Sequence, residues 1–330
     1  MKKWFSFISM FTLILLLAAC NADDTKKDTS ESQQNEDSLS VYTTVYPLQY
    51  FTEQIGGEFV DVASIYPAGA NEHSFEPTQK DMMALADADL FFYVGLGLEG
   101  FVENAQKTLA NEDVKLVPTA ANVTEDQLHI STGHTHAEHE EHDDHGHDHG
   151  EEHAHEEHDA HVWLSPVISQ QLALTIKNEL VAALPEQEAI FNSNYEQLVT
   201  ELATLHSDFE AMAAATTKKT FFVSHAAFGY IAGHYGFNQV PVAGLNSQSE
   251  PSQKELTAIV DLANKEEIQY IFFEQNVSSK LTEIIQKEVN AETLTLHNLS
   301  VLTKEDIQNN EDYFTLMRKN MDVLKQALSN

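Results

Sequence analysis

The stretch "EQEAIFNSNYEQLVTELATLHSDFEAMAAA" (residues 186–215) divides the chain into two parts of similar organisation. Its apolar residues recur at spacings of three to five, which predicts one long amphipathic helix. The positions of this stripe are Ile190, Tyr195, Leu198, Leu202, Leu205 and Phe209. At 1.5 Å per residue the helix would span about 45 Å, a length that suits a connector between two lobes.

Short runs of β-branched and aromatic residues alternate with helical patterns on both sides of this stretch. The predicted strands cover residues 41–47, 59–67, 89–95 and 114–118 before it, and 220–224, 237–242, 268–274 and 293–297 after it. Such alternation is typical of parallel sheets with helices on their faces. We therefore expect an α/β protein with two similar lobes, each built on a parallel sheet, and a long helix between them.

The expected organisation follows from these patterns and from changes in composition. It comprises a signal peptide (1–19), a flexible tether (20–38), an N-terminal lobe (39–165) that contains a histidine-rich loop (134–158), a linking helical region (166–217) and a C-terminal lobe (218–330).

Composition narrows the class of function. The chain has 330 residues, 42% of them hydrophobic, and a formal net charge of −34. This apolar content is enough for a large core, so the chain is expected to be globular. Its acidic surface would repel nucleic acids and anionic lipid headgroups and attract cations, so no nucleic-acid partner is expected.

The only cysteine, Cys20, indicates how the chain is expected to reach and hold a membrane. Lys2 and Lys3 precede an apolar run (residues 4–19) that is short for a stable membrane span, and "LAAC" (17–20) resembles a lipobox. Cys20 would then be lipidated and the protein anchored outside the cytoplasmic membrane. The alternative is an ordinary signal peptide with a chance cysteine.

Potential metal ligands follow several predicted strands. Ligands bind beyond the carboxyl ends of strands in open α/β sheets, so side chains from both lobes could meet in the cleft between them. The residues at such places are Glu72, His73, His161, His225, Glu274, His297 and Ser300. Neutral imidazole suits Zn²⁺, but each histidine could equally be a hydrogen-bonded surface or core residue, and spacing alone leaves both interpretations open.

Five motifs spread over the whole mature chain resemble the zinc-binding lipoproteins of bacterial metal ABC importers (the ZnuA/AdcA group of cluster A-I solute-binding proteins). They are "TTVYPLQYFTEQIGG" (43–57), "EHSFEPT" (72–78), "DAHVWLSP" (159–166), "FFVSHAAFGY" (221–230) and "LTLHNLS" (294–300). The resemblance implies two (β/α)4 lobes with parallel sheets, joined by a long rigid linking helix. It also implies a monomeric binding protein that captures Zn²⁺ between these lobes and delivers it to the permease and ATPase subunits of an importer. It also implies that the chain is not an enzyme.

The same resemblance implies that His73, His161 and His225 are the zinc ligands. Manganese-type relatives carry Glu where this chain has His225, which favours Zn²⁺ over Mn²⁺. The fourth ligand stays open. Many relatives have an acid at the position of Ser300, and the alternatives here are Glu72 or a water molecule.

The segment 134–158 combines ten histidines with many carboxylates and cannot contribute to a core. It is similar to the family's histidine-rich loop, which implies several weak, exchangeable zinc sites, whereas His161 belongs to the folded motif that follows. The histidines are His134, His136, His139, His142, His145, His147, His149, His153, His155 and His158. The alternative is a merely solvated acidic loop.

Three other functions compete with zinc delivery. A manganese-binding homologue would share the fold, and some relatives have been called surface adhesins. A zinc hydrolase could use Glu72 as a general base, but it would need an open coordination position, and no H-E-x-x-H motif is present.

Overall fold

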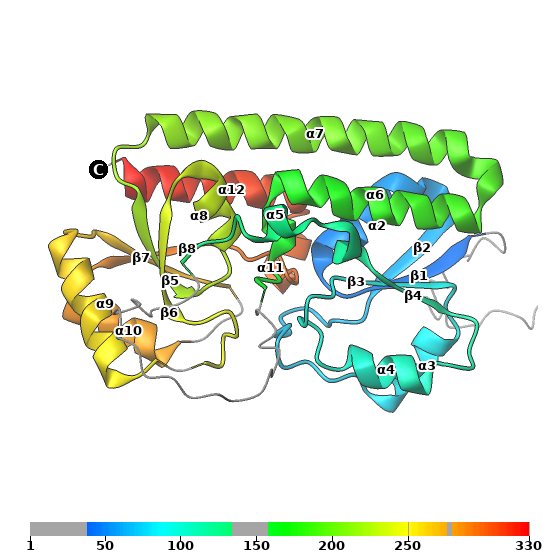
Figure 1. Ribbon diagram of the computed structural model, residues 1–330, viewed down its shortest axis with the longest axis horizontal. Coiled ribbons are helices and arrows are strands. Elements are labelled where there is room, and N and C mark those ends of the chain that lie inside the picture. Colours follow the sequence, from blue (N-terminus) through cyan, green and yellow to red (C-terminus); the bar gives the residue numbers. More distant parts are fainter. Residues whose placement is uncertain (1–37, 134–157, 250, 276–278, 330) are drawn as a thin grey trace, which may run out of the picture. The chain divides into compact units, whose positions relative to one another are not determined.

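The computed structural model describes residues 38–133, 158–249, 251–275 and 279–329, all within one compact unit, Asp37–Asn330. These residues form two four-stranded sheets (Figure 1). The first contains β1 (Leu39–Thr43), β2 (Val60–Ser64), β3 (Leu90–Tyr93) and β4 (Lys115–Pro118), and the second β5 (Thr220–His225), β6 (Asn238–Ala243), β7 (Tyr270–Phe273) and β8 (Glu292–Thr295). In the described part, no helix is both long enough and apolar enough to cross a membrane.

The two sheets have the same topology. All their strand pairs are parallel, and the spatial orders are β2-β1-β3-β4 and β6-β5-β7-β8. In each sheet the first strand in the sequence lies between the second and the third, so the connections turn in opposite directions on its two sides. A ligand crevice is expected beyond the carboxyl ends of the strands at this point. The predicted fold class, two parallel α/β lobes, is confirmed.

Helices cover the sheets on both sides. They are α2 (Tyr46–Gly56), α3 (Gln79–Ala86), α4 (Val102–Thr108), α5 (Glu125–Leu128), α6 (Pro166–Ala183), α7 (Glu188–Ala215), α8 (Gly229–Tyr235), α9 (Gln253–Lys265), α10 (Lys280–Glu288), α11 (Lys304–Gln308) and α12 (Tyr313–Leu328), with short 3-10 turns between some of them. Figure 1 shows α7 running above both sheets beside α6 and α12, with α3 and α4 below the first sheet.

Helix α7 is the predicted connector and has 28 residues, or about 42 Å of helix. Its buried stripe differs from the expected one at the first position. Ile190 is 42% exposed, whereas Phe191 is fully buried and lies two helical turns before Leu198. A seven-residue interval returns to the same face of a helix, so Phe191 and not Ile190 continues the stripe.

The first strand and the first helix are also divided differently than predicted. The strand was expected to reach Pro47, but it ends at Thr43 and helix α2 begins at Tyr46. Proline is tolerated in a first helical turn because its missing N–H has no partner within the helix there. The Tyr46 N–H donates to the Ser300 carbonyl at 2.8 Å, so the second half of the chain satisfies this helix terminus.

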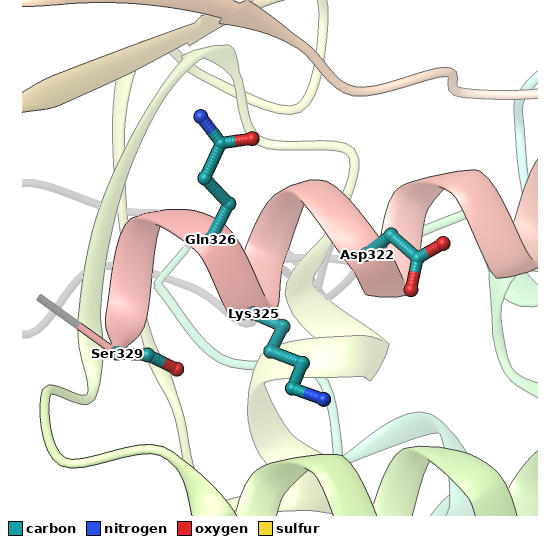
Figure 2. Close-up of a pocket in the computed structure, with 4 residues that line it drawn as sticks. All are labelled: Asp322, Lys325, Gln326 and Ser329. Carbon is teal, nitrogen blue, oxygen red and sulfur yellow. The ribbon is translucent and has the colours of Figure 1, made fainter.

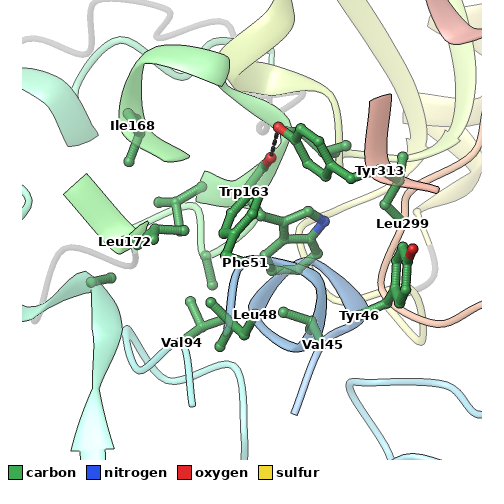
Figure 3. Close-up of a cluster of buried hydrophobic side chains, with 14 of the residues drawn as sticks. Val45, Tyr46, Leu48, Phe51, Val94, Trp163, Ile168, Leu172, Leu299 and Tyr313 are labelled. Carbon is green, nitrogen blue, oxygen red and sulfur yellow. Dashed lines mark hydrogen bonds between the residues drawn. The ribbon is translucent and has the colours of Figure 1, made fainter. Parts of the chain in front are cut away.

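The larger of two hydrophobic core clusters runs through both halves (Figure 3), and the smaller lies within the second half. Trp163 lies in the larger cluster between Leu48 and Phe51 of α2 and Tyr313 of α12. The Tyr313 hydroxyl donates to the Trp163 carbonyl at 2.9 Å, and the Trp163 indole N–H donates to the Asn298 carbonyl at 2.7 Å. Because the core is shared, contacts do not divide the unit at the domain limits expected from the sequence, and those limits stay a prediction.

Two glycines of α8 let the segment before residue 134 pack against the second half. A Cβ atom on Gly233 would lie 1.7 Å from the carbonyl oxygen of Ile130, and one on Gly229 would lie 2.1 Å from Oγ of Ser131. Real Cβ atoms do not approach other atoms so closely, so only glycine permits this contact.

We predict that Gly233→Ala lowers the free energy of unfolding by about 1–3 kcal/mol, because overpacking outweighs the gain in helix propensity. Denaturant unfolding followed by circular dichroism measures it. Gly100→Ala is the matched control, since a Cβ there meets no atom within 4 Å. Equal unfolding midpoints for the two variants would contradict the close packing of α8.

Candidate metal centre

The structure brings His73, His161 and His225 together at the carboxyl ends of the strands. His73 lies in the loop between β2 and α3, His161 directly precedes the 3-10 turn Val162–Leu164, and His225 is the last residue of β5. The centroid of the His73 ring lies 5.3 Å from that of the His161 ring and 5.5 Å from that of the His225 ring. The potential ligand atoms of these histidines and of Glu72 all lie within 4.8 Å of one another.

Two buried carboxylates orient two of the imidazoles. Nδ1 of His161 lies 2.7 Å from Oδ1 of Asp159, and Nδ1 of His225 lies 2.7 Å from Oε1 of Glu274. The carboxylates are themselves fixed, because Ser131 donates its hydroxyl hydrogen to Asp159 and Ser224 donates its own to Glu274. An ionised carboxylate only accepts hydrogen bonds, so in the neutral ring each Nδ1 carries the proton.

In this tautomer Nε2 of each ring carries no proton and presents a lone pair. The Nε2 atoms of His161 and His225 nevertheless lie only 3.2 Å apart. Two lone pairs at this distance repel each other, so the pair needs a proton or a metal ion between the two nitrogens. Nitrogen atoms bound to a tetrahedral zinc at about 2.05 Å are about 3.3 Å apart. The spacing therefore fits a shared metal ion.

Unpaired polar atoms complete the cluster. Oε2 of Glu72 and Nε2 of His73 are buried and have no hydrogen-bond partner. Burial of a carboxylate oxygen without a partner is costly, so it needs a positive group. Oε1 of Glu72 accepts a hydrogen bond from the side-chain amide of Asn298 at 3.2 Å.

Glu99 provides a contrast. It is also a buried carboxylate near strand ends of the first sheet, but both of its oxygens accept hydrogen bonds, from the Thr44 hydroxyl and from the backbone N–H groups of Val94 and Gly95. Burial raises its pKa to about 7. The satisfied oxygens make Glu99 a structural group, whereas the unpaired oxygen of Glu72 is available to a ligand.

Burial and neighbouring charges shift the pKa values of two of the imidazoles in opposite directions. Burial, with the neighbouring His161 and His225, lowers the pKa of His73 to about 2, so this ring stays neutral. Burial also lowers the pKa of His225, but the Glu274 carboxylate outweighs it and raises the pKa overall. Burial raises the pKa of Glu274, and contact with His225 outweighs it so that the carboxylate stays ionised.

Ser300 and His297 lie outside the ligand cluster. The Ser300 hydroxyl donates to Oδ1 of Asn298 at 2.9 Å. Nδ1 of His297 accepts the Leu299 N–H at 2.9 Å, and its Nε2 lies 3.1 Å from Asp306. Both ring nitrogens of His297 thus have partners in the protein.

Of the ten histidines of the tract, only His158 belongs to the described residues; the other nine lie outside them. Nε2 of His158 lies 3.4 Å from Oε2 of Glu125, and its ring centroid lies 6.0 Å from that of His129. Cys20, the expected lipidation site, also lies outside the described residues.

Sequence reasoning missed three residues of the centre. Asp159 stands two positions before His161 in a quoted motif, so its proximity was available as a signal. Glu274 is predicted only as one of several strand-end residues, and the structure shows that it orients His225. Asn298 gave no signal, because its contacts with Glu72 and Glu274 join positions 226 and 24 residues away.

Two hollows elsewhere do not resemble this centre. One, of about 410 Å³, lies on α12 and is lined by Asp322, Lys325, Gln326 and Ser329, whose side chains point in different directions (Figure 2). The other, of about 660 Å³, lies between Ala68 and Gly69 of the first half and residues of the second half that include His297 and Asp306. Neither gathers several unpaired ligand atoms.

The comparisons with known proteins agree on one family. The sequence profile of the family described as "Zinc-uptake complex component A periplasmic" (ZnuA) matches residues 41–327. The high-affinity zinc uptake system protein ZnuA of Bacillus subtilis is 34% identical over 327 residues, which cover 99% of this chain and 98% of that protein.

Two streptococcal proteins are also similar. The zinc-binding protein AdcA of Streptococcus pyogenes serotype M3 is 34% identical over 98% of this chain, which spans only 61% of the length of that relative. The crystal structure of the Zn(II)-bound ZnuA-like domain of Streptococcus pneumoniae AdcA superposes with a TM-score of 0.71 at 31% identity, covering 89% of this chain and 100% of that domain. With a family match over most of its length, this chain belongs to the ZnuA family of zinc-uptake components.

Proposed function

We propose that this protein captures Zn²⁺ between its two lobes with His73, His161, His225 and Glu72 and delivers the ion to a membrane importer. The observation that carries the proposal is the pair of Nε2 lone pairs 3.2 Å apart beside the unpaired oxygen of Glu72. Three imidazoles and one carboxylate oxygen make a tetrahedral donor set suited to Zn²⁺. Mn²⁺ prefers sites richer in oxygen, so zinc is the cargo rather than manganese.

The donor set combines both halves of the chain. Glu72, His73 and His161 precede the long helix α7, whereas His225 follows it on β5. An ion bound by all four groups therefore holds the lobes together, and their separation removes one imidazole from it. Capture and release follow from this arrangement, because each lobe alone offers an incomplete site.

Binding rather than catalysis fits the donor set and the family. A catalytic zinc keeps one coordination position open for water or substrate, whereas four protein ligands fill a tetrahedral site. The family description names a component of a zinc-uptake complex. We therefore assign no turnover to this centre, and we propose the permease and ATPase subunits of a metal ABC importer as the partners of a monomeric binding protein.

His73→Ala, His161→Ala and His225→Ala should each lower zinc affinity by more than about 100-fold, which exceeds the usual effect of removing a group that only supports a ligand. Competition with a chromophoric chelator measures the affinity, and circular dichroism checks the fold. His206→Ala on α7 is the control, since that ring contacts Tyr235 and Glu210 instead. If all three variants bind zinc like the wild type, the proposed site is wrong.

The histidine tract is proposed to collect zinc near the mouth of the site through weak, exchangeable contacts. Its composition supports this role, because dense neutral imidazoles offer many combinations of two or three ligands. At the end of the tract that the structure describes, His158 lies beside Glu125 and His129, two further potential ligands.

Replacing residues 134–158 with a short Gly/Ser linker should leave tight binding intact and reduce the zinc stoichiometry towards one. Calorimetry on both proteins measures the two quantities. A variant with all ten histidines changed to asparagine keeps the length of the tract and should bind zinc like the variant with the Gly/Ser linker. Loss of the tight phase would place the tract in the principal site, and an unchanged stoichiometry would mean that the tract binds no zinc.

The anchor is proposed to be a lipid on Cys20, with residues 1–19 removed. The sequence "LAAC" supports it, as does the outward location that the family description implies. Mass spectrometry of the membrane fraction should show an acylated N-terminal cysteine. Cys20→Ser should abolish the lipid and the membrane association, whereas an unmodified wild-type protein cleaved elsewhere would contradict the anchor.

A further inference from the structure

Asn298 is a fully buried amide at the centre of a hydrogen-bond network between the two halves. Its Oδ1 accepts hydrogen bonds from the Ser300 N–H at 3.0 Å, the Ser300 hydroxyl at 2.9 Å and the Gln275 amide at 2.8 Å. A backbone N–H can only donate, so its contact identifies this atom as the oxygen and fixes the orientation of the amide.

The nitrogen of this amide faces two carboxylates. Nδ2 of Asn298 lies 3.2 Å from Oε1 of Glu72 and 3.1 Å from Oε2 of Glu274. An amide nitrogen has two hydrogens, so each carboxylate receives one. Asn298 therefore reaches across the halves to a proposed ligand, Glu72, and also supports the carboxylate that orients His225.

The contact determines what Glu72 can offer to a metal. Oε1 is engaged by Asn298, whereas Oε2 is buried and unpaired. Each carboxylate oxygen has two lone pairs, and the hydrogen bond from Asn298 occupies one of those on Oε1, which favours binding of a metal through Oε2 alone. With the three imidazoles it gives four donor atoms, whereas a two-oxygen carboxylate would give five. Zinc favours four-coordinate sites in proteins, and manganese favours oxygen-rich sites with more ligands.

We propose that Asn298 is a specificity-determining positioning residue, which restricts Glu72 to one oxygen and so keeps the centre four-coordinate and selective for Zn²⁺ over Mn²⁺. This inference rests on the proposed function, since it takes Glu72 and the three histidines as the ligands. Asn298 would thus contribute to selectivity without being a metal ligand itself.

Asn298→Asp tests the proposal most directly. Aspartate has the same shape and still accepts the hydrogen bonds from Ser300 and Gln275, but it withdraws both donors from Glu72 and Glu274. Zinc affinity should fall about 10- to 100-fold, as for other groups that support a ligand. The ratio of the zinc and manganese affinities should fall at least about tenfold. Chelator competition with each metal alone measures both.

Asn320→Asp is the matched control. Asn320 is another buried amide of the same region, but it bonds the backbone N–H and carbonyl of His297 and touches neither carboxylate. The same substitution there should leave the affinity ratio unchanged. Asn298→Ala adds no charge and should also lower the ratio of the zinc affinity to the manganese affinity.

Cobalt substitution tests the coordination number directly. Four-coordinate Co²⁺ absorbs visible light strongly, and five- or six-coordinate Co²⁺ absorbs weakly. The wild type should give the strong spectrum and Asn298→Asp a weaker one. A weak wild-type spectrum overturns the proposal, and so does a folded Asn298→Asp protein with the wild-type spectrum and affinity ratio. Wild-type zinc binding by all three histidine-to-alanine variants would instead overturn the proposed function itself.

Discussion

The hydrogen bonds from Nδ1 of His161 to Asp159 and from Nδ1 of His225 to Glu274 determine how the centre is built. Each fixes a tautomer, and each aims a bare Nε2 lone pair at the same point. The two buried nitrogens then lie 3.2 Å apart, a spacing that needs a proton or a metal ion between them and that matches the edge of a tetrahedral zinc site.

This arrangement needs the two halves to be held in register. The shared hydrophobic core does so around Trp163, whose ring packs against α2 and whose indole N–H binds the Asn298 carbonyl. In the same segment, residues 298–300, the Ser300 carbonyl accepts a hydrogen bond from the Tyr46 N–H. Residues 298–300 therefore contribute both to the contact between the halves and to the orientation of Glu72. A change in that contact would alter the donor set, which links the lobe arrangement to metal affinity.

Much of the fold could be predicted because its signals are local. The capping box formed by Thr78 and Asp81 starts α3, and the apolar spacing of residues 186–215 identified α7 to within two residues. Boundaries failed where tertiary contacts decide them. Helix α2 starts early because the Ser300 carbonyl satisfies its first N–H. The exchange of Ile190 for Phe191 in the buried stripe of α7 is different, since Phe191 lies seven residues before Leu198 and the helical period already favours it.

The sequence by itself determined the order of strands and helices, the long connecting helix and the histidines at strand ends, because periodicity and strand-end position can be recognised within a few residues. Only the tertiary structure decided that His73, His161 and His225 converge, that Glu72 faces them with one free oxygen, and that Ser300 instead binds Asn298. These are contacts between residues up to 226 positions apart. Their geometry depends on how the two sheets pack through a common core, which no local pattern in the chain specifies.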